Sequence, residues 1–138
     1  MSVRDAFHDV VKRSLEKDGW TITHDPLQIK VADVELLIDL GAERLIAAEK
    51  QGEKIAIEIK TFSRPSAISE FHTALGQFLS YRFALEERDP KRRLFLAVPQ
   101  EPYRTFFQRR FAQIMMEKYQ LKIIVYDPVL EEIVSWKS

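Results

Sequence analysis

Two charged side chains near the middle of the chain, Glu58 and Lys60, have the types and the spacing to do chemistry on a phosphate ester. They end the run Ile55 to Lys60, in which isoleucines alternate with other residues. Alternate residues of a strand share a face, so we expect the isoleucines to enter the core and Glu58 and Lys60 to point together from the other face. A carboxylate binds a divalent cation, and an ammonium group positions a water or stabilises charge on a phosphate. The alternative is structural: a polar strand face with a cross-strand ion pair.

A second carboxylate, Asp39, lies upstream at the end of an apolar run. Magnesium in proteins binds a few carboxylates together with water and phosphate oxygens. Asp39 and Glu58 therefore predict a site for Mg²⁺ or Mn²⁺. Glu49 is the alternative first acid, because the interval from Asp39 to Glu58 is long and Glu49 belongs to the neighbouring hairpin strand. Downstream, Gln77 and Tyr81 are four residues apart, which places them on one face of a predicted helix.

The elements that must position these side chains follow from hydrophobic periodicity and from breaks at Gly and Pro. We expect a hairpin around Gly52, a long helix with Ser66 as its N-cap that stops before Asp89, and an all-apolar strand covered on both faces at the centre of the sheet. The resulting expectation is an α/β fold, a mixed central sheet flanked by helices, in a single domain 1–138. The predicted helices are 3–17, 66–88 and 102–119, and the predicted strands are 20–23, 34–40, 45–49, 55–60, 94–98, 121–126 and 133–136.

Composition excludes several classes of protein. The chain has 138 residues, 46% hydrophobic and 30% charged, which is typical of a globular domain. With no cysteine, disulfides, zinc–thiolate sites and thiol catalysis are excluded. No pair of histidines has zinc-ligand spacing, and phosphate-loop, dinucleotide and serine-hydrolase motifs are missing from the sequence. We find no signal peptide and no membrane-spanning run, so we expect a cytoplasmic protein.

The net charge is zero, but the charge is unevenly distributed. Residues 82–122 carry ten basic and five acidic side chains, enough for a patch that faces phosphate. The candidate phosphate contacts include Arg92, Arg93, Arg109 and Arg110. The alternative is a solvated helix surface, and the weak overall basicity favours a partner that supplies DNA affinity or specificity.

Taken together, Asp39, then Glu58-Ile59-Lys60, then Gln77 to Tyr81 resembles the PD-(D/E)xK nuclease pattern, and the Q-x-x-x-Y element resembles that of its RecB-like branch. The resemblance implies a restriction-endonuclease-like fold and a metal-dependent nuclease. Asp39 and Glu58 would ligate magnesium, Lys60 would assist the attacking water, and Gln77 and Tyr81 would support the site. The sequence departs from the pattern at Ile38, where the motif has proline.

A closer resemblance covers almost the whole chain. The stretches 17–27, 38–43 and 74–79 look like the XisH family, whose members are named as controlling factors for excision of the fdxN DNA element. The name implies a role beside a site-specific recombinase and a small partner, XisI. We therefore weigh three hypotheses: a magnesium-dependent DNA endonuclease, a catalytically silent DNA- or recombinase-binding factor, and a component of a toxin-like or defence pair. Cutting both strands of DNA would make a homodimer natural.

The first predicted helix offers His8 and Asp9 on its surface. Some nucleases of this fold place an acidic residue of that helix near the metal, whereas the alternative is ordinary helix polarity. Phe106 and Phe107, which lie among the arginines, have helical spacing and are expected in the core.

Overall fold

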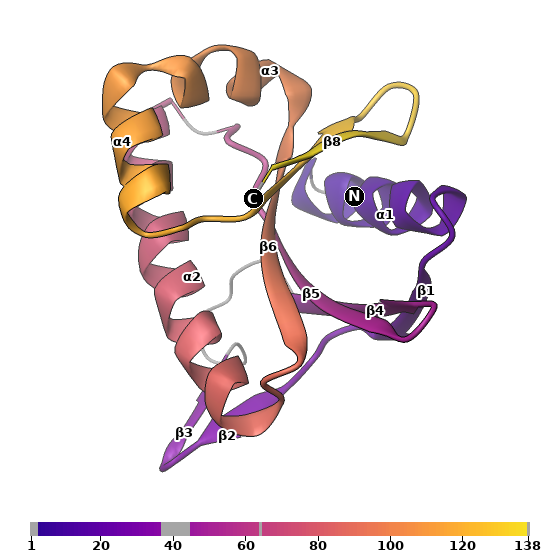
Figure 1. Cartoon of the computed structure of the whole chain (residues 1–138). Coiled ribbons are helices and arrows are strands. Elements are labelled where there is room, and N and C mark those ends of the chain that lie inside the picture. The colour runs from indigo at the N-terminus through magenta and orange to yellow at the C-terminus, as the bar shows by residue number, and fades with distance from the viewer. Residues whose placement is uncertain (1–2, 37–44, 64, 138) are drawn as a thin grey trace.

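The computed structural model describes residues 3–36, 45–63 and 65–137, and it shows a twisted sheet between two layers of helix (Figure 1). The elements in chain order are α1 (Val3–Lys17), β1 (Thr21–His24), β2 (Ile29–Val31), β3 (Val34–Leu36), β4 (Leu45–Lys50), β5 (Glu53–Ile59), α2 (Ala67–Arg88), β6 (Arg92–Pro99), α3 (Gln100–Arg104), η1 (a 3₁₀ helix, Phe106–Gln108), α4 (Arg110–Lys118), β7 (Ile123–Asp127) and β8 (Glu132–Lys137).

The described residues form a six-stranded sheet in the order β1-β4-β5-β6-β7-β8. Strands β5, β6 and β7 run parallel at its centre, and the outer pairs are antiparallel. Parallel neighbours need a crossover connection. Here α2 connects β5 to β6, and α3 with α4 connects β6 to β7. The predicted α/β fold with a mixed sheet is confirmed.

Each face of the sheet has its own hydrophobic core. On the α1 face, Val11 and Leu15 pack with Ile57 and Phe95. On the other face, α2 and α4 cover a second cluster that contains Leu94, Leu96, Val98, Phe71 and Phe78. Figure 1 shows α1 on one side of β6 and α2 with α4 on the other. Strand β6 is therefore covered on both faces, as its all-apolar sequence predicted.

Helix α2 begins where the sequence predicted. The backbone N–H of Ser69 donates to Ser66 Oγ at 3.2 Å, which satisfies one of the free donors at the helix start. Its buried face includes Phe71, Phe78 and Tyr81, whereas Ile68 is 41% exposed. Neither α2 nor another helix of the described ranges is long and apolar enough to cross a membrane.

The single helix predicted over residues 102–119 is wrong. The chain instead forms α3, η1 and α4, with breaks at Thr105 and at Arg109, whose backbone is extended. The breaks let Phe106 and Phe107 both enter the core, 8% and 0% exposed, while Phe111 stays 47% exposed. A continuous helix would keep Phe107 and Phe111 on one face. Burial of two adjacent rings thus outweighs helix continuity here.

A small second sheet of β2 and β3 lies beside the C-terminal half of α2 (Figure 1), and the sequence analysis did not predict β2. Arg88 Nε on α2 donates to the Lys30 carbonyl oxygen at 2.7 Å, which anchors this sheet. Of the predicted strand 34–40, β3 accounts for residues 34–36, and the remainder lies outside the described residues.

Candidate functional site

The Glu58–Lys60 pair sits at the C-terminal end of β5, inside the sheet. Glu58 lies opposite Leu45 of β4 and Leu96 of β6. The Lys60 backbone N–H donates to the Ala97 carbonyl oxygen at 3.0 Å, so the extended ladder continues through Lys60 and its side chain stays on the face of Glu58. The two residues are 2% and 4% exposed. Burying charged groups is costly, which makes such a pair a candidate functional site.

The face that carries this pair is the one covered by α2. Ile55, Ile57 and Ile59 pack in the α1-side core, as the alternation predicted. Ala56 belongs to the opposite core together with α2. Glu58 shares the face of Ala56, so it lies under a helix rather than on an open polar face of the sheet.

One flank of α2 carries the other predicted site residues. At 3.6 residues per turn, Glu70, Gln77 and Tyr81 fall within about 40° of one another around the helix axis. Phe71 is rotated from Glu70 by about 100°, and its ring lies 5.8 Å from that of Phe107 on the α4 side. The flank of Glu70, Gln77 and Tyr81 is therefore a different side of α2 from the one that meets Phe107.

Glu70 is a site candidate that the sequence analysis missed. It is 7% exposed, although it lies in the first turn of α2, where an acidic residue ordinarily interacts with the helix dipole at the surface. Its spacing could have identified it: Gln77 and Tyr81 lie seven and eleven residues later, which places all three side chains on one face of the helix. Fully buried Ala74, the small residue between them, leaves room on this flank for longer polar side chains.

Asp39 and Glu49 are the two candidates for the first metal-binding carboxylate, and the structure describes only Glu49. Asp39 lies outside the described residues. Glu49 pairs in register with Lys54, four residues before Glu58, which corresponds to about 13 Å along a strand. Its carboxylate lies 3.8 Å from Arg92 Nη2. The structure therefore does not bring Glu49 and Glu58 together.

The position of Arg92 gives no support to the prediction that it contacts phosphate. The residue is 6% exposed, and its Nε donates to Asp89 Oδ2 at 2.9 Å while Nη1 donates to the Ile55 carbonyl oxygen at 3.0 Å. Arg93, on the opposite face of β6, is exposed and pairs with Glu53 at 3.5 Å. Both residues lie at the start of β6, whereas Glu58 lies beside its later half.

Arg109 and Arg110 lie at the other end of β6, where the chain turns into α4. Both are exposed, as is Arg104 at the end of α3. No acidic residue occurs between 102 and 116, so this segment of the chain carries a net positive charge. The prediction that Arg109 and Arg110 contact phosphate is compatible with their positions and stays a prediction.

His8 and Asp9 of α1 differ in their environments. His8 is buried, and its Nε2 lies 2.9 Å from Asp25 Oδ1, while Lys12 Nζ donates to Asp25 Oδ2 at 2.8 Å. Burial of Asp25 by itself would raise its pKa, but the hydrogen bonds from Lys12 and His8 hold the pKa below its usual value. This cluster fastens α1 to the segment after β1. Asp9 is half-buried.

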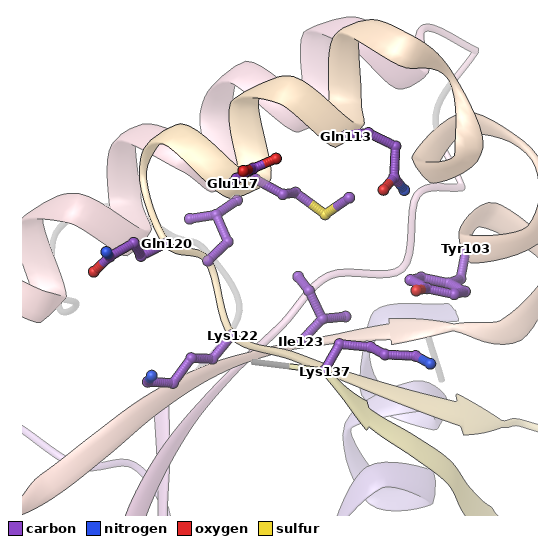
Figure 2. A pocket seen from close by; sticks show the side chains of 9 residues that line it. Tyr103, Gln113, Glu117, Gln120, Lys122, Ile123 and Lys137 are labelled. Carbon is purple, nitrogen blue, oxygen red and sulfur yellow. The ribbon is translucent and has the colours of Figure 1, made fainter.

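A pocket of about 630 Å³ lies between α4 and the start of β7, away from these residues. Figure 2 shows Gln113 and Glu117 of α4 on one side and Lys122, Ile123 and Lys137 on the other. No predicted site residue lines it. The described residues, which do not include Asp39, contain no group of three acidic or histidine side chains arranged for a metal.

Comparisons with known proteins gave consistent results. The model of the XisH protein family matches residues 1–134. The fold is similar to the crystal structure of an XisH family protein from Nostoc punctiforme PCC 73102, with 55% identity and a TM-score of 0.91, over 97% of this chain and 100% of that one. It is also similar to an fdxN element excision controlling factor protein from Anabaena variabilis, with 52% identity and a TM-score of 0.90, over 97% and 99% of the two chains. A comparison with curated proteins gave no match.

Proposed function

The chain belongs to the XisH family, and from this premise we propose that it is a metal-dependent DNA nuclease that controls excision of a DNA element. The similar protein from Anabaena variabilis is described as an fdxN element excision controlling factor, which supports the role in excision. Excision requires phosphodiester bonds to be broken. The observation that carries the nuclease proposal is the buried Glu58–Lys60 pair under α2.

The residues present fit a divalent cation by the chemistry of their donors. Carboxylate oxygens are the ligands that Mg²⁺ prefers, and Glu58 supplies one on the sheet. Asp39 is the proposed second ligand. A bound Mg²⁺ or Mn²⁺ would supply Lewis-acid polarisation of the scissile phosphate.

The protein side chains have separate proposed tasks. Lys60 lies about 7 Å along the strand from Glu58, on the same face, close enough to act on one phosphate without competing for the cation. Its ammonium positions the attacking water and stabilises negative charge on the phosphate. Gln77 and Tyr81 support the site from α2. Enclosure under α2 lowers the local dielectric constant, which strengthens each of these electrostatic interactions.

The test is cleavage of supercoiled plasmid and of single-stranded DNA by the purified chain with Mg²⁺ or Mn²⁺. Glu58→Gln and Lys60→Met keep the shape of each side chain and remove its charge. Glu53→Gln, an exposed residue of the same strand, is the matched control. Cleavage that the first two substitutions abolish and Glu53→Gln preserves would establish the nuclease. Cleavage that survives Glu58→Gln would contradict it.

A second function is favoured by the zero net charge, which supplies little affinity for DNA over the whole chain. In this proposal the chain is a catalytically silent factor that binds DNA or a recombinase together with a small XisI-like protein. Lack of cleavage with either metal, in the presence of that partner, would favour it. A homodimer would suit a nuclease that cuts both DNA strands, and sedimentation of the chain with and without DNA tests for it.

A further inference from the structure

The turn from α3 into α4 presents three arginines that form no ion pair within the described residues: Arg104, Arg109 and Arg110. All three are exposed. No acidic residue lies between 102 and 116, and in the described part of the chain the nearest ones in sequence, Glu101 and Glu117, form no ion pair with these arginines. In a chain of zero net charge, this is a local feature that favours an anionic partner.

An exposed aromatic residue follows two of these arginines directly in the chain. Phe111 follows Arg110 and is 47% exposed. Its ring is held edge-on by Phe71, at 6.2 Å and 70°, and by His72, at 6.4 Å and 76°. The ring is thus anchored to α2 while about half of the residue stays open. We call Arg104, Arg109, Arg110, Phe111 and His72 the arginine–aromatic patch.

The patch borders the candidate site. Phe62 lies two residues after Lys60, and its ring is 6.4 Å from that of Phe106 and 5.1 Å from that of Phe107. Phe71 follows Glu70 and contacts the same two rings, at 5.3 and 5.8 Å. One aromatic cluster therefore connects the end of β5 and the start of α2 with the segment that carries the arginines.

We propose that the arginine–aromatic patch binds single-stranded nucleic acid, with backbone phosphates on the arginines and one unpaired base stacked on Phe111. In a duplex, neighbouring base pairs cover the base faces, so an exposed phenylalanine ring has no base to stack on. Arginines alone suit either form, but arginines with an accessible aromatic ring suit a strand whose bases are free. The inference rests on the proposed function and adds to it the strandedness of the substrate.

The test is binding of labelled 20-nucleotide single-stranded DNA, the same sequence as a duplex, and the RNA equivalent, in EDTA so that no cleavage occurs. We expect single-stranded DNA to bind at least about tenfold more tightly than duplex. Phe111→Ala should weaken that binding roughly tenfold, the size of one lost base–aromatic stack, and Phe111→Trp should restore it. Neutralising the three arginines should lower the slope of log affinity against log salt by about 2.

Phe83→Ala is the matched control, because Phe83 is 57% exposed on α2, away from the three arginines in sequence. Circular dichroism confirms that each variant is folded. Equal affinity for single strand and duplex, or an equal effect of Phe83→Ala and Phe111→Ala, would overturn the inference. So would a concentration-dependent dimer that Phe111→Ala dissociates, because the patch would then bind protein.

The inference and the proposed function can fail separately. Binding that depends on Phe111, without cleavage in Mg²⁺ or Mn²⁺, supports the patch and contradicts the nuclease. Cleavage confined to duplex and unaffected by Phe111→Ala supports the nuclease and overturns the patch. Binding of the RNA strand alone supports the patch and contradicts a DNA substrate.

Discussion

Glu58 and Lys60 point from the same face of one strand with a single residue between them, and both are buried, at 2% and 4% exposure. An acid and a base in this relationship are ordinarily found on solvated sheet faces. Here α2 covers the face, and its own polar residues Glu70, Gln77 and Tyr81 share one flank of that helix. A buried polar arrangement of this kind has direct consequences for activity and stability.

Substituting Glu58 by Gln should reduce single-turnover DNA cleavage by at least about 100-fold, comparable to removal of an electrostatic contact to a transition state. Circular dichroism should confirm that the variant is folded, because removing one charge of a buried pair changes stability even when the shape of the side chain is kept. The companion variants Asp39→Asn and Glu49→Gln distinguish the two candidate first acids. We expect the loss with Asp39→Asn only, and a loss confined to Glu49→Gln would contradict the proposed ligand set.

Substituting Arg92 by Ala should destabilise the fold by about 2 kcal/mol, because the buried Ile55 carbonyl oxygen loses its hydrogen bond. Arg92 holds Asp89 and the Ile55 carbonyl oxygen together. The exposed neighbour Arg93 is the control, and Arg93→Ala should stay within about 0.5 kcal/mol of the parent. Urea unfolding measures both. Equal effects would contradict the structural role of Arg92.

Stability should fall as the pH falls below about 4. Asp25 and Asp89 both have pKa values held below the usual 3.8: burial opposes this, but hydrogen bonds from Lys12 and His8, and from Lys54 and Arg92, outweigh it. A carboxyl with a lowered folded pKa contributes stability above its unfolded pKa and loses it as the pH drops through the folded value.

The measurement for this pH dependence is the unfolding free energy between pH 7 and pH 2.5, for the parent chain and for Asp25→Asn. The variant should be less stable at pH 7, and the difference should shrink toward pH 2.5, since protonated Asp25 and Asn are then equivalent in charge. A difference that stays constant across this range would show that Asp25 does not titrate as its hydrogen bonds require.

Removing the cap of α2 should cost about 1 kcal/mol, because Ser66→Ala leaves the Ser69 N–H without its acceptor. Ser80→Ala, exposed within the same helix, is the matched control and should be neutral or stabilising by a few tenths of a kcal/mol. Thermal or urea unfolding compares the pair. If Ser66→Ala proves as neutral as Ser80→Ala, the cap does not stabilise the helix.

Much of the fold was predictable because it rests on local patterns. Helix α1, the hairpin of β4 and β5, the start of α2 and the central strand β6 follow from hydrophobic periodicity, from Gly52 at the hairpin turn and from the serine cap. The strand β2 and the breaks that divide the predicted helix 102–119 were not predicted. Both depend on partners distant in sequence: β2 is held by α2, and the breaks serve the burial of Phe106 and Phe107.

For the candidate site, the sequence by itself determined which residues share a face, because the two-residue period of β5 and the 3.6-residue period of α2 are properties of the local backbone. Only the tertiary structure decided which faces are covered. In the folded chain Glu58, Lys60, Glu70 and Arg92 are buried, and Phe111 is exposed to solvent. Burial depends on which element packs against a face. Such contacts join residues far apart in the chain, so the local sequence pattern does not predict them.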